Sequence, residues 1–132
     1  MEVTIERSEW LHGEGSSVSY LYRATDGKMC CLGFVSLACG LSQEQIEGVG
    51  AVEGVYNKLE IKRFHESLDK LIRERAGHDL VGNSDVANSL MMENDRQWVD
   101  DNRVTKEQFE ASREANITML FKHIDVDVKF VD

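Results

Sequence analysis

The chain has 132 residues, of which 42% are hydrophobic and 30% are charged, and its formal net charge at pH 7 is −9. This length and composition are typical of one folded domain over residues 1–132 rather than of a disordered chain. The acidic balance argues against direct binding to nucleic acid or to membrane surfaces, and no apolar run is long enough for a membrane-spanning helix.

The N-terminus and the cysteines predict the compartment. Residues 1–6 contain neither a basic region nor an apolar core, so we expect no signal peptide. Two of the three cysteines are adjacent, and the odd count does not suit a disulfide framework. A reducing cytoplasm is therefore the expected location.

The first part of the chain is expected to contain two short strands. Alternation of apolar and polar residues predicts a strand over residues 2–6, followed by a helical turn over residues 8–11. Glycine and serine predict a loop over residues 13–17. Aromatic and β-branched residues predict a second strand over residues 18–23, and an Asp-Gly pair predicts a tight turn over residues 25–27.

A helix buried on all sides is the central expectation for this chain. Residues 29–39 contain no charged side chain, and a helix that is apolar all round must be buried all round. Gly40 suits the C-terminal end of this helix. Gly33 in its middle costs about 1 kcal/mol relative to alanine, which predicts close approach of a neighbouring strand or helix. A capping box predicts a further short helix over residues 42–46.

The second half is expected to be largely helical. Apolar residues at helical spacing predict an amphipathic helix over residues 59–76 and a helix over residues 86–91. A polar loop is expected over residues 93–103, a helix capped by Thr105 follows it, and alternation predicts a strand over residues 125–132. Five residues lie roughly along one side of that last helix: Phe109, Ser112, Asn116, Met119 and Leu120.

The order of these elements indicates the fold class. It does not form regular strand-helix-strand units, so we expect an α+β domain. Its small antiparallel or mixed sheet would pack on the buried helix and on two or three amphipathic helices.

No catalytic or phosphate-binding signature is found in the sequence. Adjacent cysteines, Cys30 and Cys31, point about 100° apart on a helix and suit packing better than a metal site. Cys30 would be reactive if it were exposed at the helix N-terminus, and with His12 it defines an alternative ligand site. The histidines fall in different elements and show no metal-ligand spacing, so no metal or cofactor is expected: His12, His65, His78 and His123.

The acidic segment that follows residue 92 is the predicted partner-binding surface. It contains Glu93, Asp95, Asp100 and Asp101, together with Trp98. The carboxylates would either bind a divalent cation or form a solvated acidic loop, and the loop is favoured. Trp98 would be either a plug that returns to the core or an exposed anchor for a partner.

Parts of the sequence resemble a family of small proteins encoded by bacteriophages and prophages. The resemblance is carried by residues 10–15, 20–23 and 26–34, the last of which includes a Cys-Cys-Leu-Gly motif. Residues 90–95, with the pattern Leu-x-x-x-Asn-Asp, and the helix that begins at Thr105 are similar to later parts of that family. The resemblance implies a phage origin and assigns no catalytic residue.

Three hypotheses for function follow. The first is an interaction protein that binds and modulates a bacterial host protein or complex in the host cytoplasm, in the manner of a counter-defence inhibitor of CRISPR. The second is a small-molecule binder or small enzyme with a site near Cys30 and His12. The third is a homodimer that uses the strand edge at residues 126–131. Direct nucleic-acid binding is disfavoured because bases and acids alternate over residues 58–75.

Overall fold

The computed structural model describes residues 1–50, 86–100 and 103–132. The predicted helix over residues 59–76 lies outside these residues, whereas the helix predicted over residues 86–91 lies within them. The described helices and strands, in chain order, are β1 (Glu2–Glu6), the 3-10 helices η1 (Arg7–Glu9) and η2 (Ser16–Val18), α1 (Cys31–Ala38), α2 (Gln43–Ile46), α5 (Val86–Asp95), α6 (Lys106–Lys122) and β2 (Asp127–Val131).

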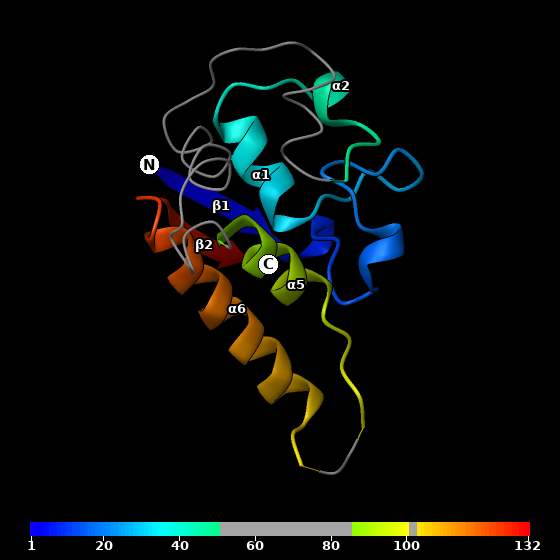
Figure 1. Ribbon diagram of the computed structural model, residues 1–132, viewed down its shortest axis with the longest axis vertical. Helices are drawn as coiled ribbons and strands as arrows, with labels where there is room; N and C mark the ends of the chain where they lie inside the picture. Colours follow the sequence, from blue (N-terminus) through cyan, green and yellow to red (C-terminus); the bar gives the residue numbers. More distant parts are fainter. Residues whose placement is uncertain (51–85, 101–102) are drawn as a thin grey trace.

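The sheet joins the two ends of the chain. β1 and β2 lie side by side as a parallel pair, with register from Glu2 opposite Asp127 to Glu6 opposite Val131. The amide of Asp127 also donates to the carbonyl oxygen of Met1 over 2.7 Å. These strands and the helices around them (Figure 1) confirm the expected α+β class, and the pairing is parallel rather than antiparallel.

The apolar helix α1 is the centre of the fold, as expected, and begins at Cys31. Every residue from Cys31 to Ser36 is buried, and α1 packs against both β1 and α5. Gly33 allows this burial, because a Cβ atom there would lie 1.9 Å from the carbonyl oxygen of Leu21. The close approach predicted at Gly33 is therefore confirmed, but its partner is the backbone at Leu21, which belongs to neither a strand nor a helix.

Helix α6 runs along α5 and β2 and begins with the predicted cap. The Thr105 hydroxyl accepts from the amide of Gln108, and the Gln108 side chain accepts from the amide of Thr105, which forms a capping box. The buried side of α6 consists of Arg113, Ile117 and Phe121, which recur at spacings of four. The row that the sequence analysis identified on this helix, from Phe109 to Leu120, is not the buried side. It lies next to the buried row.

Two predicted elements are wrong. Residues 18–23 do not form a strand, because their backbone partners are scattered: Leu21 donates to Val49, and Tyr22 forms an isolated bridge with Glu47. Among residues 1–50, 86–100 and 103–132, these partners do not make up the continuous neighbouring strand that a ladder needs. The second error is the polar loop over residues 93–103, since α5 continues to Asp95 before the loop begins.

Among the described residues, no helix is both long enough and apolar enough to cross a membrane.

Candidate functional site

The glycine-rich loop holds the C-terminal end of α5. The amides of Gly13 and Gly15 donate to the carbonyl oxygens of Asn94 and Asp95 over 2.8 and 3.1 Å. Both glycines have positive φ, at 73° and 83°, which L-residues with a side chain rarely adopt. The loop therefore satisfies carbonyl groups at the end of a helix and does not form a phosphate cradle.

The Asn94 side chain connects three segments of the chain. Its Oδ1 accepts from the Trp10 indole Nε1 over 2.8 Å and from the Cys31 amide over 3.0 Å, and its Nδ2 donates to the Leu11 carbonyl over 2.9 Å. Asn94 thereby caps α1, whose own N-cap residue Cys30 makes no side-chain cap. The three segments meet here in a buried hydrogen-bond network.

Arg113 fixes the same helix end from α6. Its side chain is fully buried, and its guanidinium donates to the carbonyl oxygens of Glu93, Asn94 and Arg96 over 2.5 to 2.9 Å. It also pairs with the Glu110 carboxylate at 3.1 Å. A buried charge needs such partners, and these bonds lock α5 against α6.

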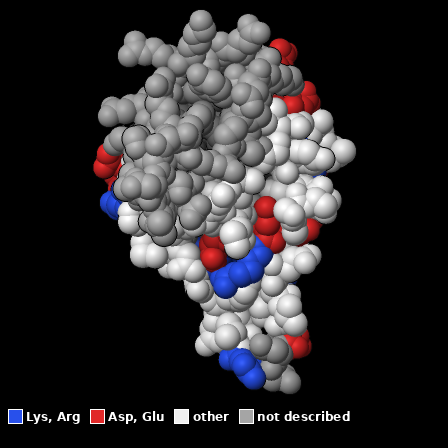
Figure 2. Space-filling view, in the orientation of Figure 1, with Lys and Arg blue, Asp and Glu red and all other residues white. Residues whose placement is uncertain are grey.

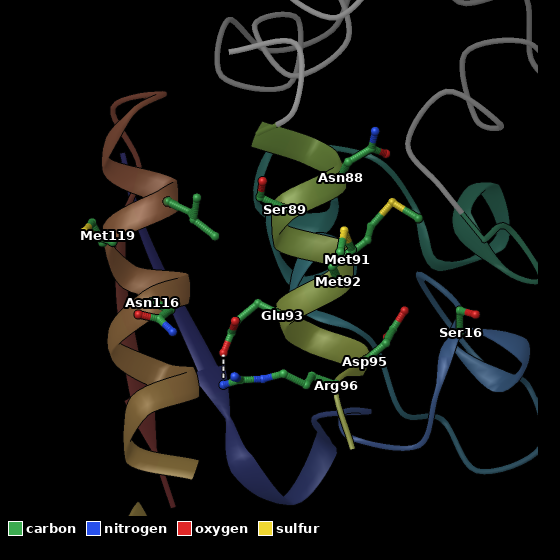
Figure 3. Close-up of a pocket in the computed structure, with 11 residues that line it drawn as sticks. Ser16, Asn88, Ser89, Met91, Met92, Glu93, Asp95, Arg96, Asn116 and Met119 are labelled. Atoms are coloured by element: carbon green, nitrogen blue, oxygen red, sulfur yellow. Dashed lines mark hydrogen bonds and ion pairs between the residues drawn. The ribbon is translucent and has the colours of Figure 1, made fainter. Parts of the chain in front are cut away.

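An open groove with a volume of about 800 Å³ lies beside this fixed helix end (Figure 3). Met92 and Met119 are 73% and 58% exposed, which is unusual for large apolar side chains. The groove is lined by residues of α5, α6 and the 3-10 helix η2: Ser16, Asn88, Ser89, Met91, Met92, Glu93, Asp95, Arg96, Asn116, Met119 and Leu120.

The charges in the groove are unevenly paired. Glu93 forms an ion pair with Arg96 at 2.7 Å on the side of α5 that faces α6 (Figure 3), and Arg96 also lies 4.3 Å from the Phe109 ring centroid. Asp95, on the side that faces Ser16, accepts from the neutral amide of Asn94 over 3.0 Å. Figure 2 shows mainly uncharged surface on the described part of this face, with acidic and basic side chains adjacent near its centre.

The structure separates the predicted partner-binding residues into two groups. Glu93 and Asp95 lie in helix α5 and line the groove. Trp98 and Asp100 line a second cavity of about 410 Å³. Asp101 lies outside the described residues.

Trp98 is half-buried and does not belong to the hydrophobic core, so its interpretation as a core plug is wrong. Its indole Nε1 donates to the Val104 carbonyl over 3.2 Å, which closes the loop between α5 and α6.

The alternative site at His12 and Cys30 is not assembled as a unit. His12 stacks on Trp10 with ring centroids 3.7 Å apart, and its Nε2 lies 3.2 Å from the Glu110 carboxylate. Together with Trp98, Lys106 and other residues, it lines a cavity of about 330 Å³. Cys30 is not among the described residues that line this cavity.

Burial also changes the chemistry of Cys30. Its side chain is in the core, and burial raises the pKa of the thiol to about 12. A reactive thiolate therefore does not form there at neutral pH. The condition for a reactive Cys30, exposure at the helix N-terminus, is not met, and the packing role favoured for this cysteine agrees with its burial. The helix end itself is occupied by Asn94.

Two features could not be read from the sequence: the groove that contains the exposed methionines, and the burial of Arg113. Met92, directly after one predicted helix, and Met119, within another, were the available signal for the groove, but only their exposure in the folded protein reveals it. In residues 1–50, 86–100 and 103–132, no group of three or more His, Cys, Asp or Glu side chains is arranged to hold a metal ion. Comparison with protein-family models, with curated proteins and with solved structures finds no match to this chain.

Proposed function

We propose that this protein is an interaction module that binds and modulates a protein of a bacterial host through the groove between α5 and α6. The observation that carries the proposal is the joint exposure of Met92 and Met119 on a groove of about 800 Å³. Because parts of the sequence resemble a family of phage proteins, the specific form that we propose is a counter-defence inhibitor in the host cytoplasm.

Exposed methionines support protein binding on physical grounds. Methionine is unbranched and polarisable, so it adapts to the shape of a partner. Burial of one methionine side chain on binding contributes about 1.5–3 kcal/mol. Two exposed methionines in one groove therefore supply an apolar anchor.

The support beneath the groove favours binding with little reorganisation. The end of α5 is held by hydrogen bonds that Arg113 and the glycine loop donate to the carbonyl oxygens of Glu93, Asn94 and Asp95. A surface that is fixed before binding loses less conformational entropy when the partner arrives.

The charge of the chain favours a partner with a basic surface. The net charge of −9 would accelerate encounter with such a partner by electrostatic attraction. Clefts that bind nucleic acid are basic, so an acidic protein can compete for them. This property fits the inhibition of a nucleic-acid-guided defence complex.

The test is affinity purification of the full chain from host lysate, with identification of bound proteins by mass spectrometry. The double variant Met92→Ser, Met119→Ser removes the anchor without adding charge. Val99→Ser is the matched control, because Val99 is 69% exposed and lies outside the groove.

We expect one specific host protein to be retained by the wild type and by the Val99→Ser control and lost by the double variant. Recovery of no specific protein at low and physiological salt would refute the proposal. Equal recovery by the double variant would refute the groove as the interface.

A second candidate function is small-molecule binding in the cavity beside His12. Its volume of about 330 Å³ is at the lower end of the range for ligand sites, and its lining combines the Trp98 ring with charged groups of Lys106 and Glu110. Native mass spectrometry of protein purified from its host tests this function. A retained ligand mass that disappears in His12→Ala supports it, and an unliganded mass in the wild type counts against it.

A further inference from the structure

We infer that the occupant of the α5–α6 groove is an amphipathic helix of the partner, with an apolar stripe and basic residues beside it. This inference rests on the proposed function, because it names the kind of segment that the interaction module recognises.

The spacing of the lining residues favours a helix. Asn88 and Met92 are four residues apart along α5, and Asn116 and Leu120 are four residues apart along α6. Arg96 follows directly after the last residue of α5 and lines the same groove. Such rows form ridges on a helix surface, and a third helix packs by placing its own ridge between them. The exposed methionines provide the apolar contacts for that ridge.

The hydrogen bonds at the end of α5 argue against an extended peptide. A strand binds by pairing its backbone with free backbone groups of its partner. Inside α5 and α6 these groups are already bonded within the helices. Near the groove, the carbonyl groups at the end of α5 are bonded to Arg113, Gly13 and Gly15. Recognition must therefore use side chains, as it does when a helix lies in a groove.

The charges in the groove indicate the sign of the charge that the partner helix carries beside its apolar stripe. Glu93 and Arg96 neutralise each other in their ion pair at 2.7 Å. The Asp95 carboxylate has an amide hydrogen bond from Asn94, and no ion pair to it is found among the described residues. A lysine or arginine of the partner helix can form an ion pair with this carboxylate, whereas a glutamate would be repelled.

The test measures fluorescence anisotropy with three labelled synthetic peptides of 18 residues added to the full-length protein. The first has leucines at positions i, i+3, i+4 and i+7 with lysines at the positions that flank this stripe. The second replaces these lysines with glutamates, and the third contains the residues of the first in an order without a stripe.

We expect only the first peptide to bind tightly. The double variant Met92→Ser, Met119→Ser should weaken its binding by about tenfold or more, since it removes apolar burial of over 1.4 kcal/mol. Asp95→Asn should weaken it less and should reduce its dependence on salt. Val99→Ser should bind as the wild type does.

Equal binding of the striped and unstriped peptides, or of the lysine and glutamate peptides, would overturn the inference. So would unchanged binding by the double variant. A dimer in sedimentation that dissociates in the double variant would assign the groove to a second copy of the chain and would also overturn it.

The two proposals can fail separately. If a host protein is lost by the double variant in the affinity purification but no peptide binds, the helical partner is wrong and the interaction module stands. If the striped peptide binds through the groove but no host protein is recovered, the proposed function is wrong.

Discussion

Gly33 is the residue where a single added carbon atom has the largest predictable effect. Its Cβ would lie 1.9 Å from the Leu21 carbonyl oxygen and 2.9 Å from the Met29 Cβ. Because the first contact is with backbone, no side-chain rotation relieves it. We expect Gly33→Ala to lower the free energy of unfolding by about 3 kcal/mol or more, measured by urea denaturation followed by circular dichroism.

The matched control is Gly50→Ala. No heavy atom of the described residues beyond its chain neighbours lies within 4 Å of a Cβ at Gly50, and its φ is not in the left-handed region. Its unfolding free energy should stay within about 0.5 kcal/mol of the wild type. Equal stability of the Gly33 variant and this control would contradict the close approach.

His12 gives the protein a predictable dependence on pH. Burial lowers the pKa of the imidazole below its ordinary value of 6.5 and outweighs the opposing effects of the Trp10 carbonyl, Glu110 and Glu114, while Arg113 lowers it further. The unfolded chain therefore binds this proton more tightly than the folded protein does. The stability contributed by neutral His12 is present above pH 6.5 and is lost as pH falls below it.

We expect the free energy of unfolding to decrease between pH 7.5 and pH 5.5 and to decrease less in His12→Gln, which cannot take up the proton. Urea denaturation at a series of pH values measures both slopes. Identical slopes for the two proteins would show that His12 titrates alike in the folded and unfolded states.

At the scale of elements, the attachment of α1 to α5 depends on Asn94. Removal of its side chain leaves the Trp10 indole, the Cys31 amide and the Leu11 carbonyl without their partner. Each unsatisfied buried group costs about 1–3 kcal/mol. We expect Asn94→Ala to lower the unfolding free energy by about 3 kcal/mol or more, measured by denaturation, with a changed near-ultraviolet dichroism of Trp10.

Asn88→Ala is the control for this prediction, because Asn88 lies on the same helix and lines the open groove instead of the core. It should change stability by about 0.5 kcal/mol or less. If Asn94→Ala were equally mild, the network at α1 would not be a main support of the fold.

The network also explains what the Cys-Cys-Leu-Gly segment does. Cys31 and Leu32 are fully buried, and the Cys31 amide begins the helix against Asn94. Gly33 allows contact with the Leu21 backbone. Each position of the motif thus has a packing role, and none supplies a reactive group.

At the scale of the whole molecule, the first and last segments stabilise each other. β2 pairs with β1 along its whole length, and the ring centroids of Phe130 in β2 and Trp10 lie 4.9 Å apart. Val3 and Ile5 of β1 are buried in the same core. We expect removal of residues 127–132 to abolish cooperative thermal unfolding, because it uncovers β1 and Trp10.

Deletion of Asp132 alone is the control for this truncation. It removes only the exposed ion pair between Asp132 and Arg7, and Arg7 retains its contact with Glu114 at 2.8 Å. The melting temperature should stay close to that of the wild type. A cooperative transition in the truncated chain would show that the fold does not need β2.

By itself, the sequence determined the elements whose signals are local. The strand over residues 2–6, the buried helix and the caps at Ser42 and Thr105 were predictable, because alternation, absence of charge and a capping box operate within a few residues. The row of residues from Phe109 to Leu120 on one side of α6 could also be recognised in the sequence, but its contribution to the groove could not.

Only the tertiary structure decided the partners that are distant along the chain. The bonds of Asn94 to Trp10, Leu11 and Cys31 join residues 63 to 84 positions apart, and the parallel pairing joins the two ends. Residues 18–23 had the composition of a strand, but within the described part of the chain their backbone partners are scattered. The methionine groove arises because Arg113 and its row are buried, which leaves the adjacent row of α6 exposed beside α5. Such features depend on which surfaces meet in three dimensions, and no local pattern encodes that.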